Sequence, residues 1–306
     1  MSVVINTNVD SLKVQSILSN STNKLSQAME RMSTGLKVNS AKDDAAGTVI
    51  AARMNVQMDG NKTAQKNVQN GSALLATAEG HLDVVQDNLS RIRDLTLQAK
   101  NGTYSTEEKQ AMQDEVAQRI AEIDRVSESS KYSSLQLFGD KNGLAGKAAT
   151  DDKPATGGAT FQVGANATVN DTITAGRDLF QSVKFDDIVK DGETETTYDE
   201  TADATKFDIS KMSAGQLTNA VKALDKGIDN LTSRKSIIGS VQNRLESALD
   251  TLTTQFENLS SAKSIITDAD IADEASKFTQ YNILQQVSTS LLAQANQAPS
   301  IALSLI

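Results

Sequence analysis

The chain of 306 residues has no cysteine, no tryptophan and a single histidine, His81. Without cysteine there is no disulfide, no thiol nucleophile and no cysteine-bound zinc. A single histidine also excludes the HExxH zinc motif, and neither a GxxxxGK[ST] loop nor a GxSxG elbow occurs. These absences predict a protein that is not an enzyme and that has no catalytic, cofactor or metal site.

The remaining candidates for metal ligands have simpler interpretations. His81 directly precedes the apolar residue Leu82, which predicts a surface histidine on the flank of a helix. Four acidic residues of the middle segment lack the DxDxDG spacing and the glycine turn of a calcium loop, so we interpret them as part of a solvated loop. They are Asp186, Asp187, Asp191 and Glu193.

The composition also limits partners and shape. The net charge of −9 and the lack of a basic cluster argue against nucleic-acid binding. No apolar run approaches the roughly 18 residues of a membrane span, and the first residues lack the pattern of a cleaved signal peptide. Aromatic residues make up 4% of the chain and none precedes Tyr104. Thin helical rods need fewer aromatic rings than a wide core does, so we expect rods.

Two long apolar stripes dominate the helical pattern. From Leu217 to Leu259 apolar residues recur at alternating steps of three and four, interrupted at Lys235. A helix of this length would span roughly 65 Å. A matching stripe runs from Val68 to Ala99. Because each stripe needs a partner, we predict a mainly α fold in which the N- and C-terminal halves form a long antiparallel coiled-coil rod.

A third rod helix follows a break at Asn101-Gly102. Ser105 and Glu108 have the spacing of a capping box, which predicts a helix beginning there. Its apolar positions recur at helical spacing and are Met112, Val116, Ile120, Ile123 and Val126.

The helical period is lost in the middle of the chain. Between Gly139 and Asp208 lie 8 of the 17 glycines, and the short alternating segments ATFQVG and DTITAG predict a β-hairpin. Seven of the eleven aromatic residues fall between Tyr132 and Phe207, as expected for a small compact core. The stretch from Asp186 to Asp203 is acidic and threonine-rich, which predicts an exposed loop.

Three regions follow from these patterns. Residues 1–43 and 267–306 form a terminal helical region, whose last helix we expect Pro299 to limit. Residues 44–180 and 210–266 form the helical rod with its hairpin, and residues 181–209 form a short, variable, exposed insertion.

The terminal region is predicted to serve assembly. Burying one large apolar side chain contributes about 1.5–3 kcal/mol, whereas fixing the backbone of one residue costs about 1–2 kcal/mol. Two Ser- and Asn-rich helices should therefore barely be stable alone and should order when neighbouring copies cover their second face. The candidate assembly residues are Leu18, Leu25, Met32, Leu36, Leu284, Val287, Leu291 and Leu292.

Five ordered stretches resemble bacterial flagellins: INTNVDSL, ERMSTGLKVNSAKDDAAG, LSRIRDLTLQAKNGT, IAEIDRVSESSKYSSLQLF and ILQQVSTSLLAQANQAP. The resemblance covers about residues 1–180 and 210–306. It implies a self-assembling subunit of the extracellular flagellar filament that serves swimming motility. In such a subunit the terminal segments form an inner tube and the rod helices surround it.

The resemblance also implies partners and leaves alternatives. Export would use the flagellar type III channel without a cleaved signal peptide, and the partners would be an export chaperone, the cap and junction proteins, and further copies of the chain. A hook-filament junction protein, whose ends resemble those of flagellin, is the alternative. A soluble binding protein with a ligand site in the middle segment is a third hypothesis.

A Toll-like receptor of an animal host is a further partner that the resemblance implies. The matching recognition residues are Arg91, Leu95 and Glu115. Ser90 and Asp94 depart from the usual residues of this stretch. The helical spacing predicts Leu95 beside the apolar seam, on the same exposed flank as Arg91, where the two would form an anchor pair.

Overall fold

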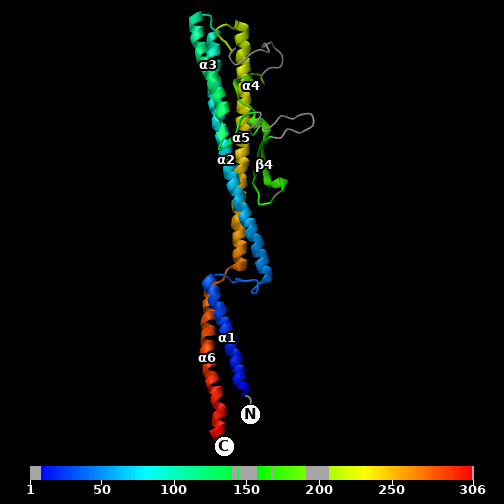
Figure 1. The fold of residues 1–306 in the computed structure, drawn as a ribbon, viewed down its shortest axis with the longest axis vertical. Coiled ribbons are helices and arrows are strands. Elements are labelled where there is room, and N and C mark those ends of the chain that lie inside the picture. Colours follow the sequence, from blue (N-terminus) through cyan, green and yellow to red (C-terminus); the bar gives the residue numbers. More distant parts are fainter. Residues whose placement is uncertain (1–7, 140–143, 145–156, 167, 191–206, 305–306) are drawn as a thin grey trace. The chain divides into compact units, whose positions relative to one another are not determined.

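The computed structural model describes residues 8–139, 144, 157–166, 168–190 and 207–304. Within these residues the fold is mainly α with two small antiparallel strand pairs, as predicted (Figure 1). None of the described helices is both long and apolar enough to cross a membrane. The helices are α1 (Val9–Thr34), α2 (Ala45–Ala99), α3 (Thr106–Ser129), α4 (Phe185–Lys190), α5 (Ala214–Thr267) and α6 (Ile271–Ser304).

The chain divides into two compact units. Unit 1 comprises residues 1–59 and 255–306, and unit 2 comprises residues 60–254. The predicted borders at residues 43/44 and 266/267 lie where α1 gives way to α2 and where α5 ends, whereas unit 1 also takes in the adjoining ends of α2 and α5.

Helix α2 carries a heptad seam through unit 2. Every third or fourth residue is buried without interruption, as in a coiled coil. These positions are Asn61, Ala64, Val68, Gly71, Leu75, Ala78, Leu82, Val85, Leu89, Ile92, Thr96 and Ala99.

Helix α5 supplies the matching seam. Within unit 2 one series of its buried residues lies seven apart and consists of Leu217, Leu224, Leu231, Ile238, Leu245 and Leu252. Four cross-helix contacts show that the two helices run antiparallel, because the residue number falls on α2 as it rises on α5. These contacts are Arg93–Asp225, Asp83–Lys235, Glu79–Gln242 and Gln65–Thr253. The predicted antiparallel pairing is confirmed.

Lys235 occupies a seam position that an apolar residue would normally fill. Its ammonium pairs with the Asp83 carboxylate and donates a hydrogen bond to Gln86 Oε1 at 3.2 Å. The interruption in the apolar stripe of α5 is therefore a polar contact with α2, of the kind that fixes coiled-coil register.

Helix α3 returns along α2 and begins as the capping box predicts. Ser105 Oγ accepts a hydrogen bond from the Glu108 N–H at 3.3 Å, and Glu108 Oε2 accepts one from the Ser105 N–H at 2.7 Å. The predicted apolar positions Val116, Ile120, Ile123 and Val126 are all buried, and Met112 is partly buried.

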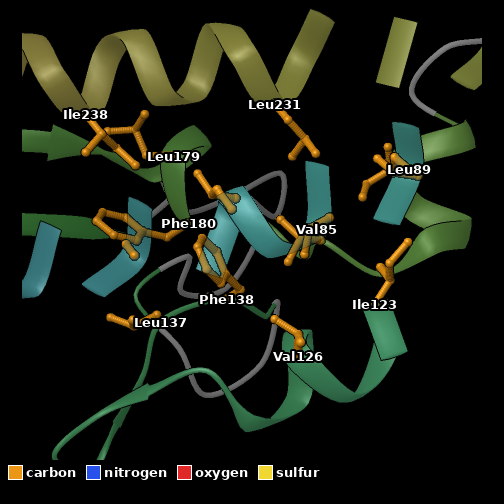
Figure 2. Close-up of a cluster of buried hydrophobic side chains, with 14 of the residues drawn as sticks. Val85, Leu89, Ile123, Val126, Leu137, Phe138, Leu179, Phe180, Leu231 and Ile238 are labelled. Atoms are coloured by element: carbon orange, nitrogen blue, oxygen red, sulfur yellow. The ribbon is translucent and has the colours of Figure 1, made fainter. Parts of the chain in front are cut away.

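The predicted hairpin is present and joins the helical core. Strands β3 (Gly158–Gln162) and β4 (Thr172–Gly176) pair antiparallel, with Phe161 opposite Ile173. A second, two-residue pair consists of β1 (Lys131–Tyr132) and β2 (Leu135–Gln136). The short 3-10 helices η1 (Val169–Asp171) and η2 (Arg177–Phe180) flank β4. Figure 2 shows Phe138, Leu179 and Phe180 packed among side chains of α2, α3 and α5.

Glycines on α2 let the hairpin approach its backbone. A Cβ added at Gly71 would lie 2.7 Å from the ring of Phe161, and one at Gly60 would lie 2.8 Å from the Cβ of Ala165. Any larger residue at these positions would push the hairpin away from the helix.

The exposed-loop prediction for the acidic segment is wrong at its start. Residues 185–190 form α4, and Val183, Phe185 and Ile188 are buried. The rings of Phe185 and Phe207 meet edge to face with centroids 5.2 Å apart. The adjacent carboxylates concealed this apolar spacing. Residues 191–206, the rest of the predicted loop, lie outside the described residues.

In unit 1, α1 and α6 form an antiparallel pair. Three contacts show this direction, because the residue number rises along α1 as it falls along α6: Asn8–Ala295, Thr22–Gln285 and Arg31–Glu274. Helix α1 ends at Thr34 because Gly35 adopts a left-handed conformation with φ of 70°.

Pro299 does not limit α6, contrary to the prediction, since the helix continues to Ser304. A proline has no N–H, so the carbonyl of Ala295 loses its usual helical donor. Asn8 compensates for this loss, because its Nδ2 donates a hydrogen bond to Ala295 O at 2.7 Å. Asn8 Oδ1 also accepts from the Ser11 N–H at 3.0 Å and so caps α1.

Candidate assembly and recognition surfaces

Exposed apolar side chains concentrate in unit 1. Of the eighteen large apolar side chains that are exposed among the described residues, thirteen belong to this unit. They are Val9, Leu12, Ile17, Met29, Val49, Ile50, Val56, Ile265, Ile271, Ile283, Leu284, Val287 and Leu291. Such a concentration is typical of a surface that a partner covers.

Four of these residues form a continuous surface, which we call the α6 outer stripe: Ile283, Leu284, Val287 and Leu291. Their exposed fractions are 55%, 39%, 47% and 47%. Their spacing places them on one side of the helix. Ile283 and Leu284 also line an open groove together with Ser276, Thr279 and Gln280. The α6 residues nearest α1 lie on a different side and include Ser288, which is buried.

The predicted assembly residues divide between two places. Leu284, Val287 and Leu291 belong to the α6 outer stripe, whereas Leu292 is half-buried. Leu18, Leu25 and Met32 are also half-buried and share the face of α1 that carries the buried residues Ser21 and Ala28. That face is the one that lies against α6 within the same chain.

Leu36 is placed differently from the prediction. It follows the end of α1 and forms an isolated β-bridge with Asp268, so it is not on the helical stripe. The left-handed Gly35 turns the chain before Leu36 is reached. The apolar residues Leu12, Ile17 and Met29 of α1, which are not among the predicted assembly residues, are exposed. For Leu12 and Ile17, the signal in the sequence was an apolar side chain that lies outside the regular apolar stripe.

Among the side chains that the structure describes, contacts between α1 and α6 bury no large apolar side chain completely. Up to residue 297, where the described side chains of α6 end, the fully buried residues of the pair are Ser21, Ala28, Glu274 and Ser288, so a methyl group is the largest apolar side chain completely buried there. Glu274 accepts from Arg31 at 3.4 Å and from Lys277 at 3.2 Å. Larger apolar residues of the pair, such as Leu18, Leu25 and Met32, are only half-buried, so the pair gains less hydrophobic free energy than complete burial would give. The outer faces of the pair still carry large exposed apolar side chains.

The candidate recognition patch brings Arg91 of α2 and Glu115 of α3 together. Arg91 Nε and Nη2 donate to the two carboxylate oxygens at 2.7 and 3.0 Å, and the side chains are 44% and 33% exposed. Hydrogen bonding by Arg91 lowers the pKa of Glu115, and hydrogen bonding to Glu115 raises the pKa of Arg91. Arg119 lies 3.7 Å from the same carboxylate and donates to Asn88 Oδ1 at 3.2 Å.

Leu95 does not lie on an exposed flank, so that prediction is wrong. Its exposed fraction is 2%. Helix α3 lies against the flank of α2 that carries Arg91, as the contacts Arg91–Glu115 and Arg119–Asn88 establish. Leu95 is therefore part of the core beneath the polar patch rather than an anchor beside it.

Within the described residues no group of three or more histidine, cysteine, aspartate or glutamate side chains is placed to hold a metal ion. His81 is half-buried beside the seam residue Leu82, as expected for a flanking position. Asp191 and Glu193 of the candidate calcium set lie outside the described residues.

Comparison with known families gives matches at both ends of the chain. Residues 5–143 match the bacterial flagellin N-terminal helical region, and residues 221–306 match the bacterial flagellin C-terminal helical region. The flagellin of Listeria monocytogenes serovar 1/2a is 33% identical over 306 residues, with 99% of each chain covered. The flagellin of Serratia marcescens is 35% identical over 351 residues, with 100% of each chain covered.

A solved structure shares the fold. It comes from Vibrio parahaemolyticus, is assigned to the flagellar hook-associated proteins and has a TM-score of 0.56. The match covers 74% of this chain and 99% of that chain at 16% sequence identity, so the similarity concerns the fold alone.

Proposed function

The chain belongs to the bacterial flagellin family of structural, non-enzymatic proteins, and from this we propose which of its surfaces build the filament. Family members polymerise into the extracellular flagellar filament, and this chain is a structural subunit of it. The α6 outer stripe and the exposed apolar residues of α1 contact neighbouring copies. The concentration of exposed apolar side chains in unit 1 is the observation that carries this assignment.

The proposed mechanism couples helix formation to assembly. Because the large apolar side chains of α1 and α6 stay half-buried or exposed, we expect the pair to be marginal in a single molecule. Neighbouring copies cover the second face of each helix and supply the missing hydrophobic free energy. The terminal helices then form the inner layer, and the helices of unit 2 supply lateral contacts. Amide exchange on the monomer tests this, since strong protection of both terminal helices would contradict it.

A charge on the α6 outer stripe tests the proposed contact surface. Val287→Glu places a carboxylate where assembly would bury it, and we expect filament formation to be lost. Gln286→Glu is the matched control, because Gln286 is the exposed neighbour of Val287 and lies away from the stripe. Sedimentation and electron microscopy measure polymer formation. Normal polymerisation of Val287→Glu would refute the assignment, and its loss in both variants would show that the contact is not confined to the stripe.

Removing residues 284–306 provides a coarser test of the same surface. The truncated chain lacks most of the α6 outer stripe, so we expect no filaments. Unit 2 should keep its helical signal and its unfolding transition, because it ends at residue 254, well before the deleted segment. Polymerisation of the truncated chain would contradict the proposed inner layer.

The hook-filament junction protein is the second candidate. The fold does not separate the two, because a structure assigned to the hook-associated proteins shares it. The relatives that match the whole chain at 33–35% identity are flagellins, which supports the filament subunit. Electron microscopy of the purified chain in polymerising salt distinguishes them, since a junction protein would not form long filaments and a soluble binding protein would remain monomeric.

Export and auxiliary partners follow from the same assignment. We propose that the chain leaves the cell through the flagellar type III channel and meets an export chaperone, the cap and junction proteins. The exposed apolar residues of α1 and α6 give a chaperone a surface to cover before assembly.

We also propose that a Toll-like receptor of an animal host binds the monomer at the Arg91–Glu115 patch. The support is an exposed, bidentate pair between two helices, with Leu95 packed beneath it. Arg91→Ala should weaken receptor signalling by purified monomer. The matched control is Arg125→Ala, which breaks the other bidentate pair of α3, with Glu122, at 63% and 40% exposure. Unchanged signalling by Arg91→Ala would refute the proposal.

A further inference from the structure

We propose that Asn101 is a site of spontaneous deamidation, which converts it to aspartate and isoaspartate. Asparagine followed by glycine occurs at residues 70–71, 101–102 and 142–143, the last of which lies outside the described residues. In this dipeptide the backbone nitrogen of the glycine can attack the side-chain amide carbon. Glycine has no Cβ to hinder the approach, and its backbone reaches conformations that other residues avoid.

The turn after α2 leaves both reacting groups accessible. The Asn101 N–H donates to Gln98 O at 3.0 Å, but the Gly102 N–H has no backbone acceptor among the described residues. A Cβ built on Gly102 would meet no atom within 4 Å, and Asn101, Gly102 and Thr103 are all exposed. The nucleophilic nitrogen is therefore neither shielded nor held by the fold.

Asn70-Gly71 is an internal control with the same two residues. The Asn70 side chain is also exposed, so side-chain exposure does not distinguish the two sites. The backbone does, because Gly71 lies inside α2 and its N–H belongs to the helical hydrogen-bond ladder. Gly71 is also buried against the ring of Phe161. Reaction at Asn70 therefore requires local opening of a packed helix.

The chemistry needs only water. The Gly102 nitrogen forms a bond to Asn101 Cγ and gives up its proton, the Cγ–Nδ2 bond breaks, and ammonia leaves. The product is a five-membered succinimide. Water then adds to one of its two carbonyl carbons and opens the ring, which yields aspartate or isoaspartate at position 101. No oxidant or reductant is involved.

Either product changes the link between α2 and α3. A carboxylate replaces a neutral amide just after the C-terminal end of α2, where the helix dipole disfavours negative charge. Isoaspartate also routes the main chain through the former side chain and so adds a methylene to the turn. This turn joins the two helices that hold Arg91 opposite Glu115.

Peptide mapping by mass spectrometry tests the proposal on the full purified chain. The protein is incubated at mildly alkaline pH, and conversion at Asn101 and Asn70 is followed in time, with fragmentation that separates aspartate from isoaspartate. We expect Asn101 to convert at least about tenfold faster than Asn70, because only the latter must wait for local opening. In urea the two rates should become similar.

Gly102→Ala supplies a variant control. The added methyl group has open space and no positive φ to oppose it, so the turn should keep its fold while conversion at Asn101 slows several-fold. The proposal is overturned if Asn70 converts as fast as Asn101 in the native chain. It is equally overturned if Asn101 stays intact under conditions in which the denatured chain converts both residues.

Discussion

Asn8 and Pro299 form a coupled pair whose energetics can be measured. Pro299 leaves the Ala295 carbonyl without a helical donor, and Asn8 Nδ2 fills that place at 2.7 Å. Asn8→Ser keeps an N-cap of similar quality for α1 but is too short to reach α6. We expect it to lower the opening free energy of the α1–α6 pair by about 0.5–1.5 kcal/mol, the net value of one hydrogen bond. Asn8→Ala should cost a further 0.5–2 kcal/mol or so, because the cap is also lost.

A double-mutant cycle isolates the contact. Pro299→Ala restores an N–H that can bond to Ala295 O, so in that background Asn8→Ser should cost little. The expected coupling is about 0.5–1.5 kcal/mol. Native-state hydrogen exchange of α1 and α6 amides provides the measurement, since about 1.4 kcal/mol changes protection tenfold.

The cycle also cancels the general effect of removing a proline from a helix, which is about 3 kcal/mol. That effect appears in both arms, so the remaining difference reports on the hydrogen bond from Asn8. If Asn8→Ser has the same cost with and without Pro299→Ala, the Asn8 side chain does not compensate for the missing N–H and the reasoning fails.

Three further predictions concern unit 2. Gly71→Ala should destabilise it by about 1–3 kcal/mol, because the new Cβ would meet the ring of Phe161 in β3. Gly80→Ala, whose Cβ meets no atom, should stabilise α2 by up to about 1 kcal/mol. Similar urea midpoints for the two variants would contradict the close approach of β3 to Gly71. Leu95→Ala should cost about 2–5 kcal/mol and Leu97→Ala, at an exposed position, about 0.5 kcal/mol or less, and equal costs in urea denaturation would contradict the burial of the former. Hydrogen bonding to Arg91 lowers the pKa of Glu115 below the ordinary 4.5. The ion pair therefore contributes to the free energy of unfolding above pH 4.5, and this contribution is lost as the pH falls through the lowered pKa of Glu115. The urea midpoint of the wild type should thus fall more steeply on acidification than that of Glu115→Gln. If the two midpoints fall equally as the pH is lowered, the ion pair adds no stability.

The features that the sequence predicted correctly are those written in local patterns. The spacing of three and four residues identified both partners of the coiled coil, and the Ser105–Glu108 spacing located the start of α3. Alternation over a few residues identified β3 and β4. Each of these elements depends on the period of its own residues, which neighbouring elements did not override.

The errors arose where a third element decides the environment. Leu95 has the spacing of a flank residue and is buried because α3 returns over that flank, which the spacing along α2 does not encode. Pro299 is a helix breaker by local rules, but Asn8, distant in sequence, satisfies the carbonyl it leaves unpaired. The stripe of α1 was assigned to assembly, although Leu18, Leu25 and Met32 lie on the face turned toward α6. A periodic pattern identifies an apolar face but not which partner covers it.

The separation of the two seam helices along the chain has a consequence during protein synthesis. Arg93 contacts a residue 132 positions later and Gln65 one 188 positions later. A ribosome adds about 5–20 residues per second, so α2 is finished on the order of ten seconds before its partner has been translated. For that interval α3 can cover only one flank of α2, the part of the apolar stripe that faces α5 stays without its partner, and the coiled coil cannot close until the last third of the message has been read.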